Sequence, residues 1–220
     1  MLAAACGGGD DATPSDDTRA LLQAVALTTA DLPPGLQLAS VSVSTNQDVA
    51  DASVDSEGTL AKLESRGRVL GYDWQFEPAP DAPSSLVVRG LQSTASLYKT
   101  AAGAGEALAE GIAGARNTDW KAVNPDESDV QAAELPLPSR ADEGTWFRIT
   151  GTDGKGNMVI DDQVAFRVDN VRGFLRVLTT FVASTDRNGY HDEVAGWVTL
   201  VANRIRDRLQ HGTPAVSAAP

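Results

Sequence analysis

The chain has 220 residues, of which 42% are hydrophobic, and this length and composition fit one folded domain or at most two small ones. Acidic residues number 30 and basic residues 18, and the formal net charge of −12 argues against a nucleic-acid partner, which requires clustered Lys and Arg. Cys6 is the only cysteine, which excludes an internal disulfide and a cysteine-based zinc cluster. No apolar run reaches the roughly 18 residues that a membrane-spanning helix needs.

The N-terminus carries a short motif around this cysteine, Leu2-Ala3-Ala4-Ala5-Cys6-Gly7. The motif resembles the lipobox of bacterial lipoproteins, in which small residues fit the signal peptidase and the cysteine thiol accepts a diacylglycerol. Ala3 stands where that motif usually has Leu, and the basic and apolar parts of a signal peptide are missing, as a start codon assigned too late would explain. The resemblance implies a lipoprotein held at the extracytoplasmic face of the cell membrane through Cys6.

The segment after the motif has the composition of a linker. Residues 7–17 contain only Gly, Asp, Ala, Thr, Pro and Ser, so they have no apolar side chain large enough to pack in a core. We therefore predict a residual signal and flexible tether over residues 1–17, a single folded domain over 18–210 and a disordered tail over 211–220.

In the first half of the domain, turn signals separate short periodic segments. Pro33-Pro34-Gly35 is a firm turn signal. The patterns predict a short helix or strand within 18–30, a strand over 36–44, a polar loop over 46–57, a helix over 59–68, a hairpin of 69–76 with 86–91, and a helix over 95–116. The hairpin carries a stripe of alternating apolar residues, Leu70, Tyr72, Trp74 and Phe76.

The second half contains the clearest pattern of the chain. After a short strand at 130–135, the segments 145–150, 158–168 and 171–183 alternate as three strands of a meander. Asp169-Asn170 suits a two-residue hairpin turn because both residues tolerate positive φ. Residues 192–209 place apolar side chains, Trp197 among them, on one helical face, which predicts a final amphipathic helix.

This order of elements predicts an α+β fold in which helices pack on an antiparallel sheet and an amphipathic helix ends the chain. The layout, together with the Asp-Leu-Pro-Pro-Gly motif at residues 31–35, resembles the sensor-like and Mog1/PsbP-like domains of actinobacterial lipoproteins. That resemblance implies a binding or sensor domain outside the cytoplasm.

Aromatic residues with arginines beside them are the candidate ligand-binding side chains. Such residues line clefts for small molecules, although aromatic residues in strands more often belong to the core. The candidates are Tyr72, Trp74, Arg89, Trp120, Trp146 and Arg148, with Arg167 as a further polar anchor.

Nucleophilic catalysis needs a histidine beside the nucleophile, and this chain contains only His191 and His211. His191 precedes the last helix among acidic residues that favour helix initiation, and His211 falls in the predicted tail. We therefore assign no catalytic residue.

Two acidic clusters have simpler explanations than chemistry. Asp161 and Asp162 are adjacent in a strand, so they should point to opposite faces and do not form an acid–base pair by themselves. In residues 153–157, Lys155 occupies a calcium-ligand position, which favours a hairpin turn over a calcium loop. No metal site or cofactor is predicted.

The first hypothesis is thus a lipid-anchored, extracytoplasmic binding or sensor protein without catalytic activity. Its partners would be the membrane, through the anchor, and a small molecule or an envelope protein. The alternatives are an envelope hydrolase built from scattered carboxylates and His191, and a structural partner of envelope proteins. A pocket of strand aromatics would favour the first hypothesis, a carboxylate cluster of raised pKa beside His191 the second, and a broad exposed apolar patch the third.

Overall fold

The computed structural model describes residues 16–138, 140–181 and 190–211. The strands within these residues are β1 (Leu36–Ser44), β2 (Arg68–Pro78), β3 (Val88–Tyr98), β4 (Ser128–Leu135), β5 (Glu143–Thr152), β6 (Met158–Val168) and β7 (Val171–Phe181). The helices are α1 (Asp16–Val25), α2 (Asn46–Asp51), α3 (Ser56–Ser65), α4 (Ala101–Arg116), α5 (Trp120–Val123) and α6 (Tyr190–His211), with a 3-10 turn η1 (Thr29–Asp31).

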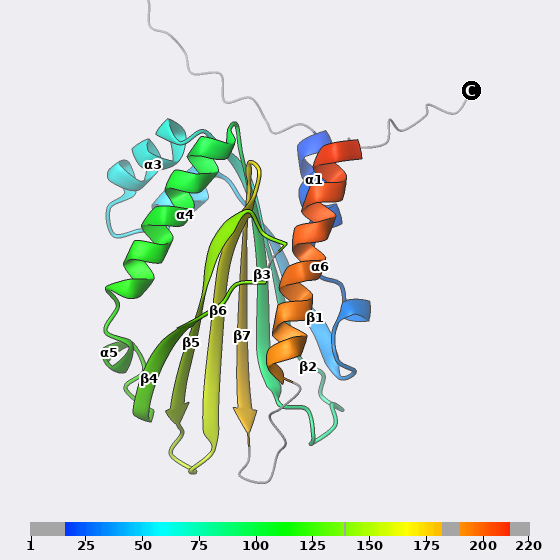
Figure 1. Cartoon of the computed structure of the whole chain (residues 1–220), viewed down its shortest axis with the longest axis vertical. Coiled ribbons are helices and arrows are strands. Elements are labelled where there is room, and N and C mark those ends of the chain that lie inside the picture. Colours follow the sequence, from blue (N-terminus) through cyan, green and yellow to red (C-terminus); the bar gives the residue numbers. More distant parts are fainter. Residues whose placement is uncertain (1–15, 139, 182–189, 212–220) are drawn as a thin grey trace, which may run out of the picture.

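The strands form one antiparallel sheet in the order β1-β2-β3-β7-β6-β5-β4. Helices α1 and α6 lie side by side on one face of this sheet, and α4 packs on the other face (Figure 1). We call these the α6 face and the α4 face. The predicted α+β architecture, with an amphipathic helix at the C-terminal end of the described chain, is confirmed.

The main core lies between the sheet and the pair α1 and α6. The predicted stripe of β2 faces this core, and its members Leu70, Tyr72, Trp74 and Phe76 are between 0% and 6% exposed. Trp197 of α6 belongs to the same core, and its indole N–H donates to the backbone oxygen of Asp31 at 3.1 Å.

The motif at residues 31–35 connects α1 to β1 and also supports α6. Asp31 accepts two hydrogen bonds from Arg204, each 2.9 Å long. Partial burial alone would raise the pKa of Asp31, but the hydrogen bonds from Arg204 and Thr28 hold it below its ordinary value. Gly35 has φ of 98°, and a Cβ there would also lie 2.8 Å from Pro83, so this turn requires glycine.

Turn predictions in the second half are confirmed. Asp169 adopts φ of 51° between β6 and β7. In the β5–β6 turn, Asp153 Oδ1 accepts the backbone N–H groups of Lys155 and Asn157 at 2.9 and 2.8 Å, as expected of a hairpin turn.

The polar loop predicted over residues 46–57 is wrong, because side-chain caps start two helices there. Thr45 and Asp48 form a capping box at the start of α2, and Asp55 accepts the N–H of Gly58 at the start of α3. Helix α3 consequently begins at Ser56 and ends before the predicted residue 68.

The helix predicted over 95–116 is wrong at its start, since β3 continues to Tyr98 and pairs there with β2 and β7. Helix α4 begins only after Thr100, whose hydroxyl accepts the N–H of Gly103.

The predicted ends of the domain also shift. Asp16 and Asp17 of the predicted tether start α1, and His211 of the predicted tail ends α6. Residues 1–15 and 212–220, which complete these two segments, lie outside the described residues, as do residues 182–183 of the predicted last strand.

Candidate functional site

A row of polar side chains crosses the α4 face of the sheet. Gln75 of β2, Gln92 of β3, Arg176 of β7 and Gln163 of β6 are in-register neighbours, and Phe147 of β5 continues the line. We call the first four residues the polar row. Because neighbouring strands lie about 4.8 Å apart, the polar row is roughly 14 Å long.

Asp161 orders one half of the polar row. This carboxylate is 6% exposed and lies two residues before Gln163, on the same face of β6. It accepts Nε and Nη2 of Arg176, each at 2.9 Å, and Nε2 of Gln163 at 2.8 Å. The hydrogen bond to Asp161 raises the pKa of Arg176 above its ordinary value. The charge of the one arginine in the row is thereby balanced, and two of its donors are fixed.

Asp73 of β2 orders the other half. Its Oδ2 accepts the side-chain amide of Gln92 and, at 2.9 Å, the hydroxyl of Thr94. Its Oδ1 is buried and has no hydrogen-bond partner among the described residues. A buried acceptor without a donor costs stability.

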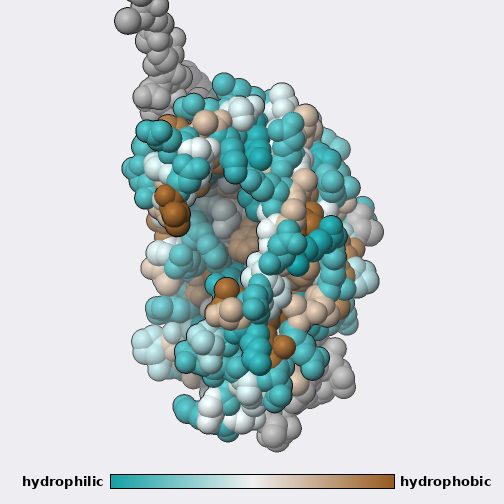
Figure 2. Space-filling model, turned by 90° about the vertical axis from the view of Figure 1, so that its left-hand side faces the viewer, coloured by the Kyte–Doolittle hydropathy of each residue, from teal (hydrophilic) through white to brown (hydrophobic). Residues whose placement is uncertain are grey.

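A cavity of about 300 Å³ lies over the part of the sheet formed by β2, β3 and β7. Its polar lining residues are Gln75, Gln92 and Arg176, and the rest of the lining is Phe76, Gly90, Leu91 and Leu178. A Cβ on Gly90 would meet nothing within 4 Å, so the backbone there borders open space. The Arg176 side chain is 48% exposed. Figure 2 shows the side of the molecule that carries α3, α4 and α5, and this side is hollowed.

Asp162 points to the α6 face, so the prediction that the adjacent aspartates face opposite sides is confirmed. Asp162 is 0% exposed and accepts Nε1 of Trp146 at 2.6 Å and Nε and Nη2 of Arg148 at 2.8 and 3.0 Å. His191 stacks on Trp146 with 4.6 Å between ring centroids. We call Asp162, Arg148, Trp146 and His191 the buried network; it fastens the first turn of α6 to β5 and β6. His191, predicted to precede the helix, lies inside that turn.

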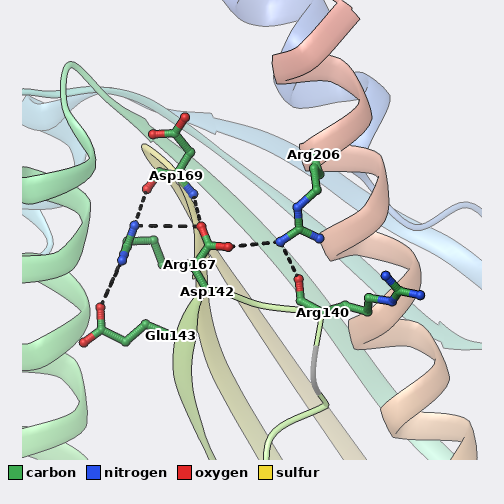
Figure 3. Close-up of polar contacts among 6 residues, drawn as sticks. All are labelled: Arg140, Asp142, Glu143, Arg167, Asp169 and Arg206. Carbon is green, nitrogen blue, oxygen red and sulfur yellow. Dashed lines mark hydrogen bonds and ion pairs between the residues drawn. The ribbon is translucent and has the colours of Figure 1, made fainter.

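A second cavity, of about 320 Å³, lies between the β6–β7 hairpin and the end of α6. Three of its four charged side chains, those of Asp142, Arg167 and Arg206, form ion pairs (Figure 3). Asp142 accepts Nη2 of Arg206 at 3.0 Å and the backbone N–H of Asp169 at 2.7 Å, and Arg167 lies 3.3 Å from Glu143. Because both arginines already face carboxylates, this cluster joins the start of β5 to α6 and explains Arg167 as a structural residue.

The structure separates the ligand-binding residues predicted on the strands. Tyr72 and Trp74 stack on each other inside the main core, with 5.4 Å between ring centroids. Trp146 and Arg148 belong to the buried network. These four side chains therefore pack on the α6 face, away from the polar row.

Trp120 and Arg89 lie elsewhere. Trp120 begins α5 and packs against Phe147, with 6.5 Å between ring centroids, so it lies just beyond the β6 end of the polar row. Arg89 is exposed near the start of β3. Of the predicted residues, Trp120 is thus the one that the fold brings beside the polar row.

Sequence reasoning missed the glutamines of the polar row. A polar residue at every second strand position is typical of a solvated face, and that is how Gln75, Gln92 and Gln163 would be interpreted. The available signal was Asp161 with Gln163, two polar residues on one face of a strand whose other positions are mostly apolar.

The segment before β4 places Glu127 beside the same face. A Cβ on Gly151 of β5 would lie 2.2 Å from Oε2 of Glu127. Burial, with the nearby charges of Asp161 and Asp153, raises the pKa of Glu127 above the ordinary value of 4.5. The ionised carboxylate therefore reduces stability at neutral pH, and this cost disappears as the pH falls through the raised pKa towards 4.5.

We expect Glu127→Gln to raise the urea midpoint at neutral pH and to change it little in acid. Midpoints measured across this pH range, with the exposed Glu106→Gln of α4 as the control, test this expectation. An increase that persists in acid would show that the charge of Glu127 is not its cause.

The protein is thus an α+β domain whose sheet carries an ordered row of polar side chains on its α4 face. Among the described residues, no three His, Cys, Asp or Glu side chains are grouped so that they could hold a metal ion. Within the same part of the chain, no helix combines the length and hydrophobicity needed to cross a membrane.

The same fold occurs in a solved extracellular domain. This domain is that of PknH from Mycobacterium tuberculosis, with a TM-score of 0.55 and 9% sequence identity over 89% of this chain and 98% of that chain. At this identity the likeness shows the fold alone. No family model and no curated protein matches the sequence.

Proposed function

We propose that this chain is a non-catalytic binding protein of the cell envelope, which takes a small polar ligand on the α4 face. The observation that carries this proposal is the polar row, whose donors are held in place by Asp161 and Asp73 beside a cavity of about 300 Å³. Ordered polar groups in a concave site favour binding because little side-chain freedom remains to be lost.

The position of the histidines supports a role without catalysis. His191 stacks on Trp146, and its nearest carboxylate, that of Asp192, is 90% exposed at 3.5 Å. His211 lies at the end of α6, where its Nδ1 is 2.9 Å from the backbone oxygen of Asp207. Neither imidazole lies beside the polar row.

The extracytoplasmic location has two supports, the fold shared with an extracellular domain and the lipobox-like motif around Cys6. Cys6 itself lies outside the described residues. The proposed attachment is a diacylglycerol on its thiol, with the folded part displayed at the outer face of the membrane.

The test uses a precursor in which a signal peptide precedes Met1. In this precursor, Cys6→Ser is expected to move the protein from the membrane fraction to the soluble fraction, because Cys6 is the only cysteine of the sequence that could accept the lipid. Fractionation followed by immunoblotting measures this change, with Thr13→Ser as the matched control. Unchanged partitioning of the Cys6→Ser protein would contradict lipidation.

A thermal-shift screen tests the binding function. Neutral, anionic and cationic polar small molecules are added to the purified chain, and at least one class should raise the unfolding midpoint, because ligand bound only to the folded state stabilises it. The same compounds should leave the midpoint of the double variant Gln92→Ala/Gln163→Ala unchanged. If no class stabilises the wild-type chain, or if the double variant responds equally, the proposed site is wrong.

A further inference from the structure

We propose that the ligand of the polar row is a neutral carbohydrate, an inference that rests on the binding function above and names its ligand class. The first argument is the charge of the site. Arg176 is the one charged residue that lines the cavity, and Asp161 holds it with two hydrogen bonds of 2.9 Å. Asp73 adds a negative charge beside Gln92. The two carboxylates lie behind the lining rather than in it, and the pairing with Asp161 leaves the lining no unpaired cation for an anionic ligand.

The second argument is the mixture of donors and acceptors. A glutamine amide has one acceptor oxygen and two N–H donors, and one donor each of Gln92 and Gln163 is already used by a carboxylate. The acceptor oxygens and the second N–H donors of these glutamines therefore remain available along the row. A hydroxyl both donates and accepts through a single oxygen, so a polyhydroxylated ligand satisfies this mixture, whereas an ammonium group only donates.

The third argument is shape. The row runs across the strands for roughly 14 Å, which suits several linked sugar rings in line. Beyond its β6 end lies Trp120, which packs on the buried Phe147, and the apolar face of a sugar ring packs on such an aromatic side chain. An extended peptide, by contrast, typically pairs its backbone with a sheet edge, while the polar row lies on a face.

Tryptophan fluorescence gives this proposal a local reporter. Trp74, Trp146 and Trp197 are no more than 6% exposed, whereas Trp120 is half-buried. A sugar ring bound beside Trp120, beyond the β6 end of the row, should therefore change the fluorescence emission of Trp120. The change should disappear in Trp120→Phe.

The experiment titrates the purified chain with short linear oligosaccharides of glucose, mannose, arabinose or N-acetylglucosamine, followed by calorimetry and fluorescence. We expect saturable binding by at least one series, with Gln92→Ala and Gln163→Ala each raising Kd by about tenfold, which corresponds to one or two lost hydrogen bonds. Gln131→Ala on β4, an exposed glutamine on the opposite face, is the matched control and should bind as the wild type does.

Three results would overturn the inference. Binding that does not depend on Gln92 and Gln163 would place the carbohydrate elsewhere. Stabilisation by a charged compound or a peptide, lost in the double variant and without oligosaccharide binding, would leave the binding function standing and refute the ligand class. If no compound of any class binds, both the ligand class and the binding function fail.

Discussion

Asp162→Ala is expected to lower the free energy of unfolding by about 3–5 kcal/mol, because removing one partner of a buried ion pair leaves the other charge uncompensated. Asp162 is 0% exposed and accepts hydrogen bonds from Trp146 and Arg148, whose side chain is 19% exposed. Without the carboxylate, the indole N–H and most of the guanidinium lose their partners inside the protein. Urea denaturation measures the loss.

The adjacent aspartate provides the matched control. Asp161→Ala removes the partner of Arg176, but that side chain is 48% exposed and can be hydrated instead. We therefore expect a clearly smaller loss for Asp161→Ala. The double variant Asp162→Ala/Arg148→Met should recover part of the stability, since it removes the uncompensated charge. Equal losses for the two aspartates would show that the buried network contributes no more than the more exposed pair.

Trp197→Ala is expected to lower the free energy of unfolding by about 3–5 kcal/mol, because it leaves a large cavity in the main core. Trp197 is 6% exposed, packs between α6 and the sheet, and donates to the backbone oxygen of Asp31. The substitution would also remove the hydrogen bond between α6 and the backbone of Asp31. Arg204 of the same helix would still bind the Asp31 carboxylate. Denaturant midpoints of the variant and the wild-type chain measure the effect.

Two changes that remove no large buried side chain serve as controls for Trp197→Ala. Gln210→Ala alters an exposed position of the same helix, and deletion of residues 7–15 removes only small or polar residues before α1. Both should leave the midpoint nearly unchanged. A Trp197→Ala protein as stable as these controls would contradict the proposed packing of α6.

Local sequence patterns were sufficient for most strands and for the last helix. The alternation of Leu70, Tyr72, Trp74 and Phe76 predicted one buried face, and the structure buries that face. Local reasoning failed where a cap or a distant strand decided the outcome. Thr45 and Asp55 convert an acidic stretch into helices, and residues 95–98, although followed by a helical pattern, are held in β3 by β2 and β7.

The sequence by itself determined that Asp161 and Asp162 lie on opposite faces, because side chains of a strand alternate with a period of two. The predicted meander also placed β6 between β5 and β7, but it did not specify the arginine that each aspartate binds. Gln163 and Arg176 come from the predicted β6–β7 hairpin, whereas Gln92 joins them only because β3 pairs with β7, a strand far away in the sequence. Alternation specifies the face of each side chain but not the neighbour of each strand, so only the tertiary structure could assemble the polar row.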